Sequence, residues 1–291
     1  MNEKETIDLH VHTNRSDGDM SPTEIVNMSK QRKLSAVAIT DHDTTEGLDE
    51  AIRAGARQGI DVIPGIELTM SCMSGTLHVV GLYINHNYSE LVQELARIKE
   101  DRKGRAIEIL RQLNLVLANE QKEITEEESI GQAFGSVGRM HIAKAMVKKG
   151  YVDNIEQAFD MYLKKLDLPK RKIGYMEGFA LLNLAGAIPV LAHALRRNDN
   201  SLLTITSKPQ EQKKVLFELR EHGLIGVECA RERQEFRDMV QSLDLIVTDA
   251  SDYHGPSQPE YAELGSLMVP RTVLDNLQAA KENYQRKKYS K

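Results

Sequence analysis

Histidines and acidic residues gather at a few points of this 291-residue chain, with spacings suited to metal binding. His10 and His12 form a His-x-His pair within the apolar run 6–11 and the residue after it. On a strand, side chains two residues apart point to the same face, so both imidazoles would project together. Such a pair at a strand end can present two nitrogen ligands to one metal ion. Asp17 lies in a polar turn five residues later and can bring a carboxylate to the same point.

Other apolar runs carry the same residue types inside them or directly after them. Mixed imidazole and carboxylate donors suit Zn, Mn or Fe. One ion cannot use so many ligands, so the set could fill two or three sites. The candidate metal ligands are His10, His12, Asp17, His42, Glu67, His78, His193, Asp252 and His254.

Each candidate taken alone has an ordinary structural interpretation. A single buried histidine such as His78 is more often a hydrogen-bonded core residue, and Asp17 or Glu67 alone is more often a turn or cap residue. The metal interpretation rests on repetition, because all but one of the apolar runs carry such a group. Buried charges of one sign need a counter-charge, and the sequence shows no concentration of Lys or Arg among these residues.

Seven apolar runs would position these ligands. Each run is followed by polar residues and then by a helical pattern. Their Val, Ile and Leu content fits parallel strands buried on both faces. Helices are expected at 21–32 and 45–58, the first with Ser21 as its cap and Pro22 in its first turn. The alternation favours an α/β fold, either a β/α barrel or a doubly wound sheet. The seven runs are 6–11, 35–40, 60–66, 76–84, 188–191, 224–228 and 245–248.

The alternation stops between about residues 87 and 177, where no strand is expected. Helices are predicted there at 91–117, 140–149 and 155–166. We therefore predict a barrel made of residues 1–86 and 178–291, with a helical insertion of residues 87–177 after the fourth strand. The insertion would cover the active face as a substrate lid. A packing domain that never contacts substrate is the alternative.

Composition narrows the class of protein further. The net charge of -5 and pI of about 6.0 argue against bulk electrostatic binding of nucleic acid or anionic membranes. Two cysteines, Cys72 and Cys229, are too few for a disulfide framework. The first residues lack an apolar signal segment and no run of 18 apolar residues occurs, so we expect a cytoplasmic protein without membrane spans.

Together, these motifs resemble the polymerase and histidinol phosphatase (PHP) superfamily of metal-dependent phosphoesterases. The matching segments are 8–13, 16–18, 40–43, 63–67 and 251–255, in the order that the family shows. The resemblance implies a distorted (β/α)7 barrel and usually three metal ions. By resemblance, His10, His12, Glu67 and Asp252 bind the first ion, Asp17, His42 and His254 the second, and His78 and His193 a third that shares Glu67.

A further segment, 138–143, resembles the Gly-Arg-Pro-His-Ile-Ala element of small stand-alone members of the superfamily. In that branch the arginine and histidine contact substrate phosphate, which implies this role for Arg139 and His141. Met140 and Ala194 stand where the branch usually has proline. Both departures change backbone restraint rather than ligand chemistry.

The expected activity is hydrolysis of phosphate from small nucleotides such as nucleoside 3',5'-bisphosphates, with possible trimming of short 5'-phosphorylated oligonucleotides. Two or three divalent ions of Mn, Fe or Zn would activate water and neutralise phosphoryl charge. Arg139 would bind a second phosphate, and His141 would bind phosphate or protonate the leaving oxygen. An aromatic content of 5% without Trp argues against long strands or duplexes as substrates. Two alternatives remain: a histidinol-phosphatase-like enzyme acting on a non-nucleotide metabolite, and a non-catalytic metal-binding module.

Overall fold

The computed structural model describes residues 5–131, 136–166, 168–169, 171–197, 200–230 and 232–289. Seven strands lie side by side in the order β8-β7-β6-β4-β3-β2-β1. Beyond β1 and β8 the chain segments meet, because Val11 pairs with Tyr253 in a parallel bridge. This pairing nearly closes the sheet into a barrel. The strands are β1 (Thr6–Asp8), β2 (Ala36–Ile39), β3 (Asp61–Cys72), β4 (Gly75–Leu82), β5 (Ile173–Gly174), β6 (Ile188–Leu191), β7 (Gly226–Glu228), β8 (Ile246–Thr248) and β9 (Val269–Pro270).

All seven predicted apolar runs form strands, and the predicted barrel class is confirmed. The prediction that these strands are parallel is wrong for β4, which runs antiparallel to both β3 and β6. The reason is a tight hairpin: β3 continues to Cys72, and the chain reverses at Met73, whose φ is 51°. Parallel neighbours need a long crossover, whereas a two-residue turn permits only antiparallel pairing.

Two short strands were not predicted. β5 lies within the segment that was expected to contain no strand, and it pairs with β3 at Met70. β9 pairs antiparallel with β1 and extends the sheet beyond it. Both are two residues long, which is too short for an apolar period to show in the sequence.

The predicted helix beginning at Ser21 is confirmed as α1. Its first turn is closed by a capping box, in which Ser21 Oγ accepts from Glu24 N while Glu24 Oε2 accepts from Ser21 N at 2.7 Å. Helix α2 ends at Gly59, which takes the left-handed conformation that glycine adopts without cost. The predicted helix at 155–166 is α6 followed by a π-helical turn, η2 (Phe159–Leu163). The helices are α1 (Pro22–Gln31), α2 (Leu48–Gln58), α3 (Ser89–Leu117), α4 (Glu126–Ser129), α5 (Arg139–Lys148), α6 (Ile155–Ala158), α7 (Tyr175–Leu184), α8 (Pro209–Glu221), α9 (Gln234–Gln241) and α10 (Thr272–Tyr289), with 3-10 turns η1 (Ala118–Glu120) and η3 (Leu202–Thr204).

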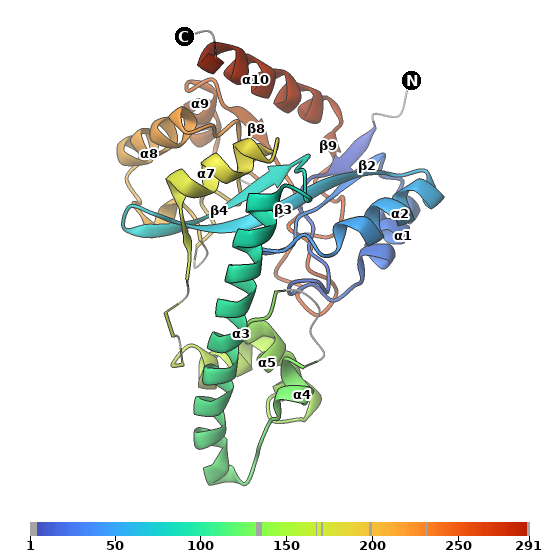
Figure 1. Ribbon diagram of the computed structural model, residues 1–291, viewed down its shortest axis with the longest axis vertical. Coiled ribbons are helices and arrows are strands. Elements are labelled where there is room, and N and C mark those ends of the chain that lie inside the picture. Colours follow the sequence, from blue (N-terminus) through green and yellow to red (C-terminus); the bar gives the residue numbers. More distant parts are fainter. Residues whose placement is uncertain are drawn as a thin grey trace.

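Helix α3 connects two separately packed regions of the molecule. Its first turns bury Leu91 and Leu95 in the core of the barrel. Its later turns bury Ile109 and Leu113 in a second core, shared with α5 and η2. Figure 1 shows α3 running from the sheet into the lobe that holds α4 and α5. The lobe is therefore held against the barrel by a continuous helix. No helix in the described ranges is long and apolar enough to span a membrane.

Candidate metal centre

The carboxylate of Glu67 lies at the centre of a ring of imidazoles at one end of the barrel. Glu67 is fully buried, so its charge must be balanced by its immediate neighbours. Its Oε1 lies 3.4 Å from His10 Nε2, 3.0 Å from His78 Nδ1 and 3.2 Å from His193 Nε2, and its Oε2 lies 3.3 Å from His12 Nε2 and 2.7 Å from His42 Nδ1.

The His-x-His pair lies in the extended segment after β1 rather than within the strand. Backbone pairing fixes this segment on both sides: His12 N donates to Tyr253 O at 2.9 Å, and Val11 N donates to Thr40 Oγ1 at 3.0 Å. The extended backbone keeps His10 and His12 on one face, with their Nε2 atoms 3.0 Å apart. The two imidazoles thus converge as their spacing predicts.

His78 reaches the same end of the barrel because β4 runs in the opposite direction. It lies near the start of β4, opposite Thr69 of β3, where the parallel strands have their carboxyl ends. Asn200 approaches the outer ring nitrogen of His78, with Nδ2 and Nε2 2.7 Å apart. The direction predicted for β4 was wrong, but β4 still places His78 in the centre.

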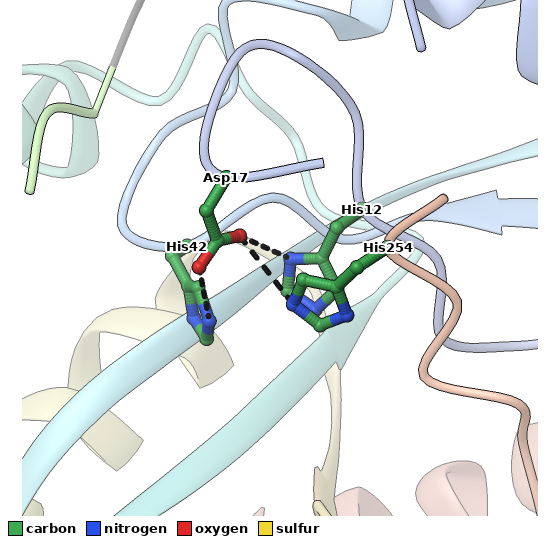
Figure 2. A group of neighbouring side chains, drawn as sticks. All are labelled: His12, Asp17, His42 and His254. Atoms are coloured by element: carbon green, nitrogen blue, oxygen red, sulfur yellow. Dashed lines mark ion pairs between the residues drawn. The ribbon is translucent and has the colours of Figure 1, made fainter. Parts of the chain in front are cut away.

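The other two predicted carboxylate ligands, Asp17 and Asp252, also lie beside histidines of this group. Asp252 Oδ1 is 3.3 Å from His10 Nε2 and 3.2 Å from His12 Nε2. Figure 2 shows Asp17 facing three imidazoles; its carboxylate lies 3.7 Å from His12 Nδ1, 3.6 Å from His42 Nε2 and 3.4 Å from His254 Nε2. The structure thus gathers all nine predicted ligands at one end of the barrel.

The turn that carries Asp17 is tightly folded. Gly18 N donates to Thr13 O at 2.9 Å, which reverses the chain directly after the His-x-His segment. A Cβ at Gly18 would lie 2.7 Å from His12 O, so only glycine allows this close approach. The turn returns the Asp17 carboxylate to His12.

Seven of the nine side chains form groups that are compact enough to hold metal ions. Three overlapping groups have ligand atoms within 4.8 Å of one another, and they centre on His12 with Asp17, on His10 with Glu67, and on Glu67 with His78. Within the described part of the chain, Asp17 Oδ1, Glu67 Oε2, His42 Nδ1 and His254 Nε2 are buried without a well-formed hydrogen bond. A buried polar atom left in this way costs about 1–3 kcal/mol. Bound cations would satisfy these atoms, so the residues fit a metal centre.

The pKa shifts of the carboxylates and of His78 suit metal binding. Burial would lower the pKa of His10 and of His12, but the facing carboxylates raise both, to about 10 for His12. Burial alone would raise the pKa of Glu67, but His78 and His42 beside it lower that pKa well below its usual range. The pKa of Asp17 is likewise lowered against the effect of burial, by His42 and His254. Burial lowers the pKa of His78 to about 4, although Glu67 opposes this. Ionised carboxylates and neutral imidazoles are the forms that bind metal ions.

Glu228 supports the centre and was not identified from the sequence. Its Oε1 lies 2.9 Å from His10 Nδ1, and its Oε2 accepts a hydrogen bond from His193 N at 2.8 Å. A carboxylate on Nδ1 orients the imidazole and leaves Nε2 for a metal. The signal was present, because Glu228 ends the run 224–228, the one run to which no ligand was assigned.

Two further carboxylates brace the loops that hold the ligands. Asp41 accepts from Thr13 N at 2.8 Å and from Ser16 Oγ at 2.6 Å, and so joins the loop after β2 to the Asp17 turn. Asp43 accepts from Thr69 N at 2.8 Å and pairs with Arg102 of α3. These contacts link segments far apart in sequence, which a motif search cannot detect.

Two of the predicted ligands have strained backbones. His193 and Asp252 have φ angles of 30° and 55°, where residues other than glycine are uncommon. Each such conformation costs on the order of 1–3 kcal/mol and occurs most often at functional sites. Asp252 also pairs with Arg196, three residues after His193. The sequence shows no concentration of cations among the predicted ligands, and it therefore did not identify Arg196 as a neighbour of Asp252.

A pocket of about 640 Å³ opens over this centre, a volume typical of small-molecule sites. Asp17, His42 and His78 line it from the barrel. Arg139 and His141, at the start of α5, line it from the lobe that packs on the second core. Three of the predicted ligands and both predicted phosphate-contacting residues therefore line one cavity.

Both Arg139 and His141 have contacts with nearby residues of this lobe. Arg139 donates from Nη1 to Leu163 O at 3.3 Å, and its guanidinium lies 5.6 Å from the centre of the Phe159 ring. His141 Nδ1 accepts from Gly138 N at 3.2 Å. Burial lowers the pKa of His141, an effect that Asp17 opposes.

Six histidines and three carboxylates gathered at one end of a barrel, below a pocket of about 640 Å³, are the arrangement expected of a metal-dependent phosphoesterase. Residues 8–177, more than half of the chain, match the family model of the PHP domain. The chain therefore belongs to the PHP family, and it is a metal-dependent phosphoester hydrolase.

Relatives from three bacteria support this assignment. The chain is 31% identical to a 5'-3' exoribonuclease of Haemophilus influenzae over 86% of this chain and 90% of the relative. It is 29% identical to a 3',5'-nucleoside bisphosphate phosphatase of Chromobacterium violaceum over 87% and 88% of the two chains. The crystal structure of a Bifidobacterium adolescentis protein assigned to the metal-dependent phosphoesterases superposes with a TM-score of 0.80, at 26% identity over 95% and 96% of the chains.

Proposed function

We propose that this enzyme removes the 3' phosphate from nucleoside 3',5'-bisphosphates and also trims short 5'-phosphorylated oligonucleotides. The observation that carries the proposal is the shared pocket, where the histidine and carboxylate centre faces Arg139 and His141. A cavity of about 640 Å³ accommodates a mononucleotide but not a long duplex. The names of the two relatives, a bisphosphate phosphatase and an exoribonuclease, agree with this substrate class.

We propose that the nine gathered residues hold two or three divalent ions of Mn, Fe or Zn. When bound, such ions polarise phosphoryl oxygens and make water more acidic. The ligands are kept in place by their neighbours: Glu228 orients His10, and Asn200 approaches His78. The anionic carboxylates keep the centre attractive to cations at neutral pH.

The insertion residues would select and orient the substrate. The Arg139 guanidinium can donate two parallel hydrogen bonds to the phosphate that is not cleaved. His141 would bind phosphate or give a proton to the leaving oxygen. Under this proposal, residues 87–177 form a substrate-covering insertion on a barrel of residues 1–86 and 178–291.

The test is hydrolysis of two substrates by metal-replete protein, with and without a chelator. Adenosine 3',5'-bisphosphate and a 5'-phosphorylated trinucleotide would be supplied, with His10→Ala as the control. Chelator-sensitive release of the 3' phosphate, lost in the variant, supports the phosphatase role, and mononucleotide release from the trinucleotide supports the trimming role. If metal-loaded protein turns over neither substrate, the nucleotide proposal is wrong. Sugar and amino-alcohol phosphates would then be tested.

A further inference from the structure

Lys144 of α5 extends from the lobe to the turn that carries Asp17. Its ammonium donates to Asp17 O at 2.9 Å and to Gly18 O at 3.2 Å, and it lies 2.9 Å from Asp19 Oδ1. An ammonium has three N–H donors, so these acceptors can use all of them. Lys144 is not among the described residues that line the metal-centre pocket. It therefore binds the turn from outside the pocket.

Asp19 also takes part in a network on the barrel side. Its Oδ2 accepts from Ser257 N and its Oδ1 accepts from Ser257 Oγ, both at 2.7 Å. Its backbone N donates to His254 O at 2.7 Å. Asp19 thus joins the Asp17 turn to the loop after β8, and Lys144 joins α5 to the same point.

The Asp17 turn supplies the carboxylate of one candidate cation-binding group (Figure 2). The ligand atoms of this group lie within 4.8 Å of one another, and its members are His12, Asp17, His42 and His254. Asp17 Oδ1 is buried without a well-formed hydrogen bond among the described residues. The backbone oxygen of Asp17, in contrast, accepts from Lys144 and also from Gln258 Nε2 at 2.8 Å. The backbone is therefore fixed from two sides, while the carboxylate remains available for a cation.

We propose that Lys144 is a positioning residue for the cation held by this group, and that it acts through the Asp17 turn. The inference rests on the proposed metal centre and extends it to a residue of the lobe. Contacts that orient a metal ligand typically contribute about 10- to 100-fold in metal affinity. Because Lys144 lies on the same helix as Arg139 and His141, its contacts also hold that helix beside the centre.

The positive charge of Lys144 needs its own counter-charge, because it lies near a proposed cation site. Asp19 supplies this charge at 2.9 Å and is outside the nine gathered ligands. The two charges largely cancel at the cation, since they lie close together. Lys144 therefore contributes through the geometry of the turn rather than through its electric field.

Three variants separate this role from a general effect on the lobe. Lys144→Met keeps the length of the side chain and removes its charge and its donors. Lys144→Arg keeps a cation that can donate to the same acceptors, so it should restore most of the function. Lys148→Met is the matched control, because Lys148 lies one turn later on α5 and is exposed.

The first measurement is Mn²⁺ binding to metal-free protein by calorimetry. In Lys144→Met, one ion should bind about 10- to 100-fold more weakly, and the affinities of the others should stay nearly unchanged. Lys144→Arg should recover most of the lost affinity, and Lys148→Met should match the unmodified protein. A contact that only stabilises the fold would lower the thermal unfolding temperature without weakening one particular ion.

Hydrogen exchange of the metal-free protein is a second measurement, and it needs no cation. Gly18 N donates to Thr13 O, so peptides that cover residues 13–19 report on the turn. The turn should exchange faster in Lys144→Met than in the unmodified protein or in Lys148→Met, because its contact with α5 is lost. Peptides from β4 should exchange equally in all of them.

The outcomes separate this inference from the proposed metal centre. Unchanged Mn²⁺ affinities in Lys144→Met, or an equal weakening of every ion, would overturn the inference and leave the metal centre intact. If the unmodified protein binds no Mn²⁺, the proposed centre fails. The exchange comparison then still decides whether Lys144 positions the turn, and unchanged exchange in Lys144→Met would contradict it.

Discussion

The two walls of the active pocket are built in different ways. On the barrel side, the predicted ligands lie in or follow strands of one nearly closed sheet, and Glu67 is fully buried among five imidazoles. On the insertion side, Arg139 and His141 stand at the start of one short helix that packs on a separate core. Strands on both sides constrain a residue in the sheet, whereas α5 packs on a core of its own, so we expect substitutions of its pocket-lining residues to act independently of the centre. Under the proposed function, the barrel wall holds the metal ions, and the wall formed by Arg139 and His141, which we call the insertion wall, sets substrate preference.

The largest expected effect comes from removing the charge at the centre of the barrel wall. Glu67→Gln keeps the shape of the side chain but leaves five imidazoles without their shared carboxylate. Loss of metal assistance worth several kcal/mol predicts a fall in kcat of about a thousandfold or more. Initial rates with saturating metal measure this. Glu263→Gln, at a surface ion pair with Arg32, is the control and should be unaffected. A fall in Glu67→Gln of less than about tenfold would contradict the assignment.

A smaller effect is expected at Glu228, which contacts the predicted ligand His10. Glu228→Gln keeps an oxygen near His10 Nδ1 but removes the charge that orients the imidazole. Such supporting carboxylates typically contribute about 10- to 100-fold in metal affinity or activity. Activity titrated against added Mn²⁺ should require more metal than in the unmodified enzyme. An unchanged titration curve would show that Glu228 serves the fold alone.

On the insertion wall, the effect should depend on the substrate rather than on the metal. Arg139→Ala should raise KM for adenosine 3',5'-bisphosphate by about 10- to 100-fold, because hydrogen bonds to a charged group contribute about 1.5–3 kcal/mol. Metal content and activity on adenosine 3'-monophosphate should change little. A loss of bound metal in this variant would show that the two walls are not independent.

The smallest effect is expected from thiol reagents. Cys72 and Cys229 are buried and free. Burial raises the pKa of the Cys72 thiol to about 11 and that of Cys229 to about 12, so little thiolate exists at pH 8. Native protein should therefore resist alkylation at pH 8 and remain active, while denatured protein should show two reactive thiols. Rapid loss of activity with iodoacetamide would show that a cysteine lies at the pocket.

The sequence predicts the gathered residues of the barrel wall better than the residues that contact them. Each predicted ligand follows or lies in an apolar run, so a fold that brings the strand ends together also brings these residues together. The direction of β4 was missed, although the nine residues between the runs 60–66 and 76–84 are too few for a parallel crossover. Asp43 with Arg102 and Glu228 with His10 are pairs separated by 59 and 218 residues. Such pairs form only when the sheet is closed and α3 is packed against it, so no local sequence pattern predicts them.

The central claim is that the barrel wall holds metal ions around Glu67, and metal content tests it most directly. The protein and its Glu67→Gln variant would be reconstituted with Mn²⁺, freed of excess metal and measured by plasma mass spectrometry. We expect about two or three ions per chain in the unmodified protein and at most about one in the variant, since Glu67 lies between neighbouring ligand groups. An unmodified protein that retains no metal, or a folded variant that retains the same number, would contradict the account.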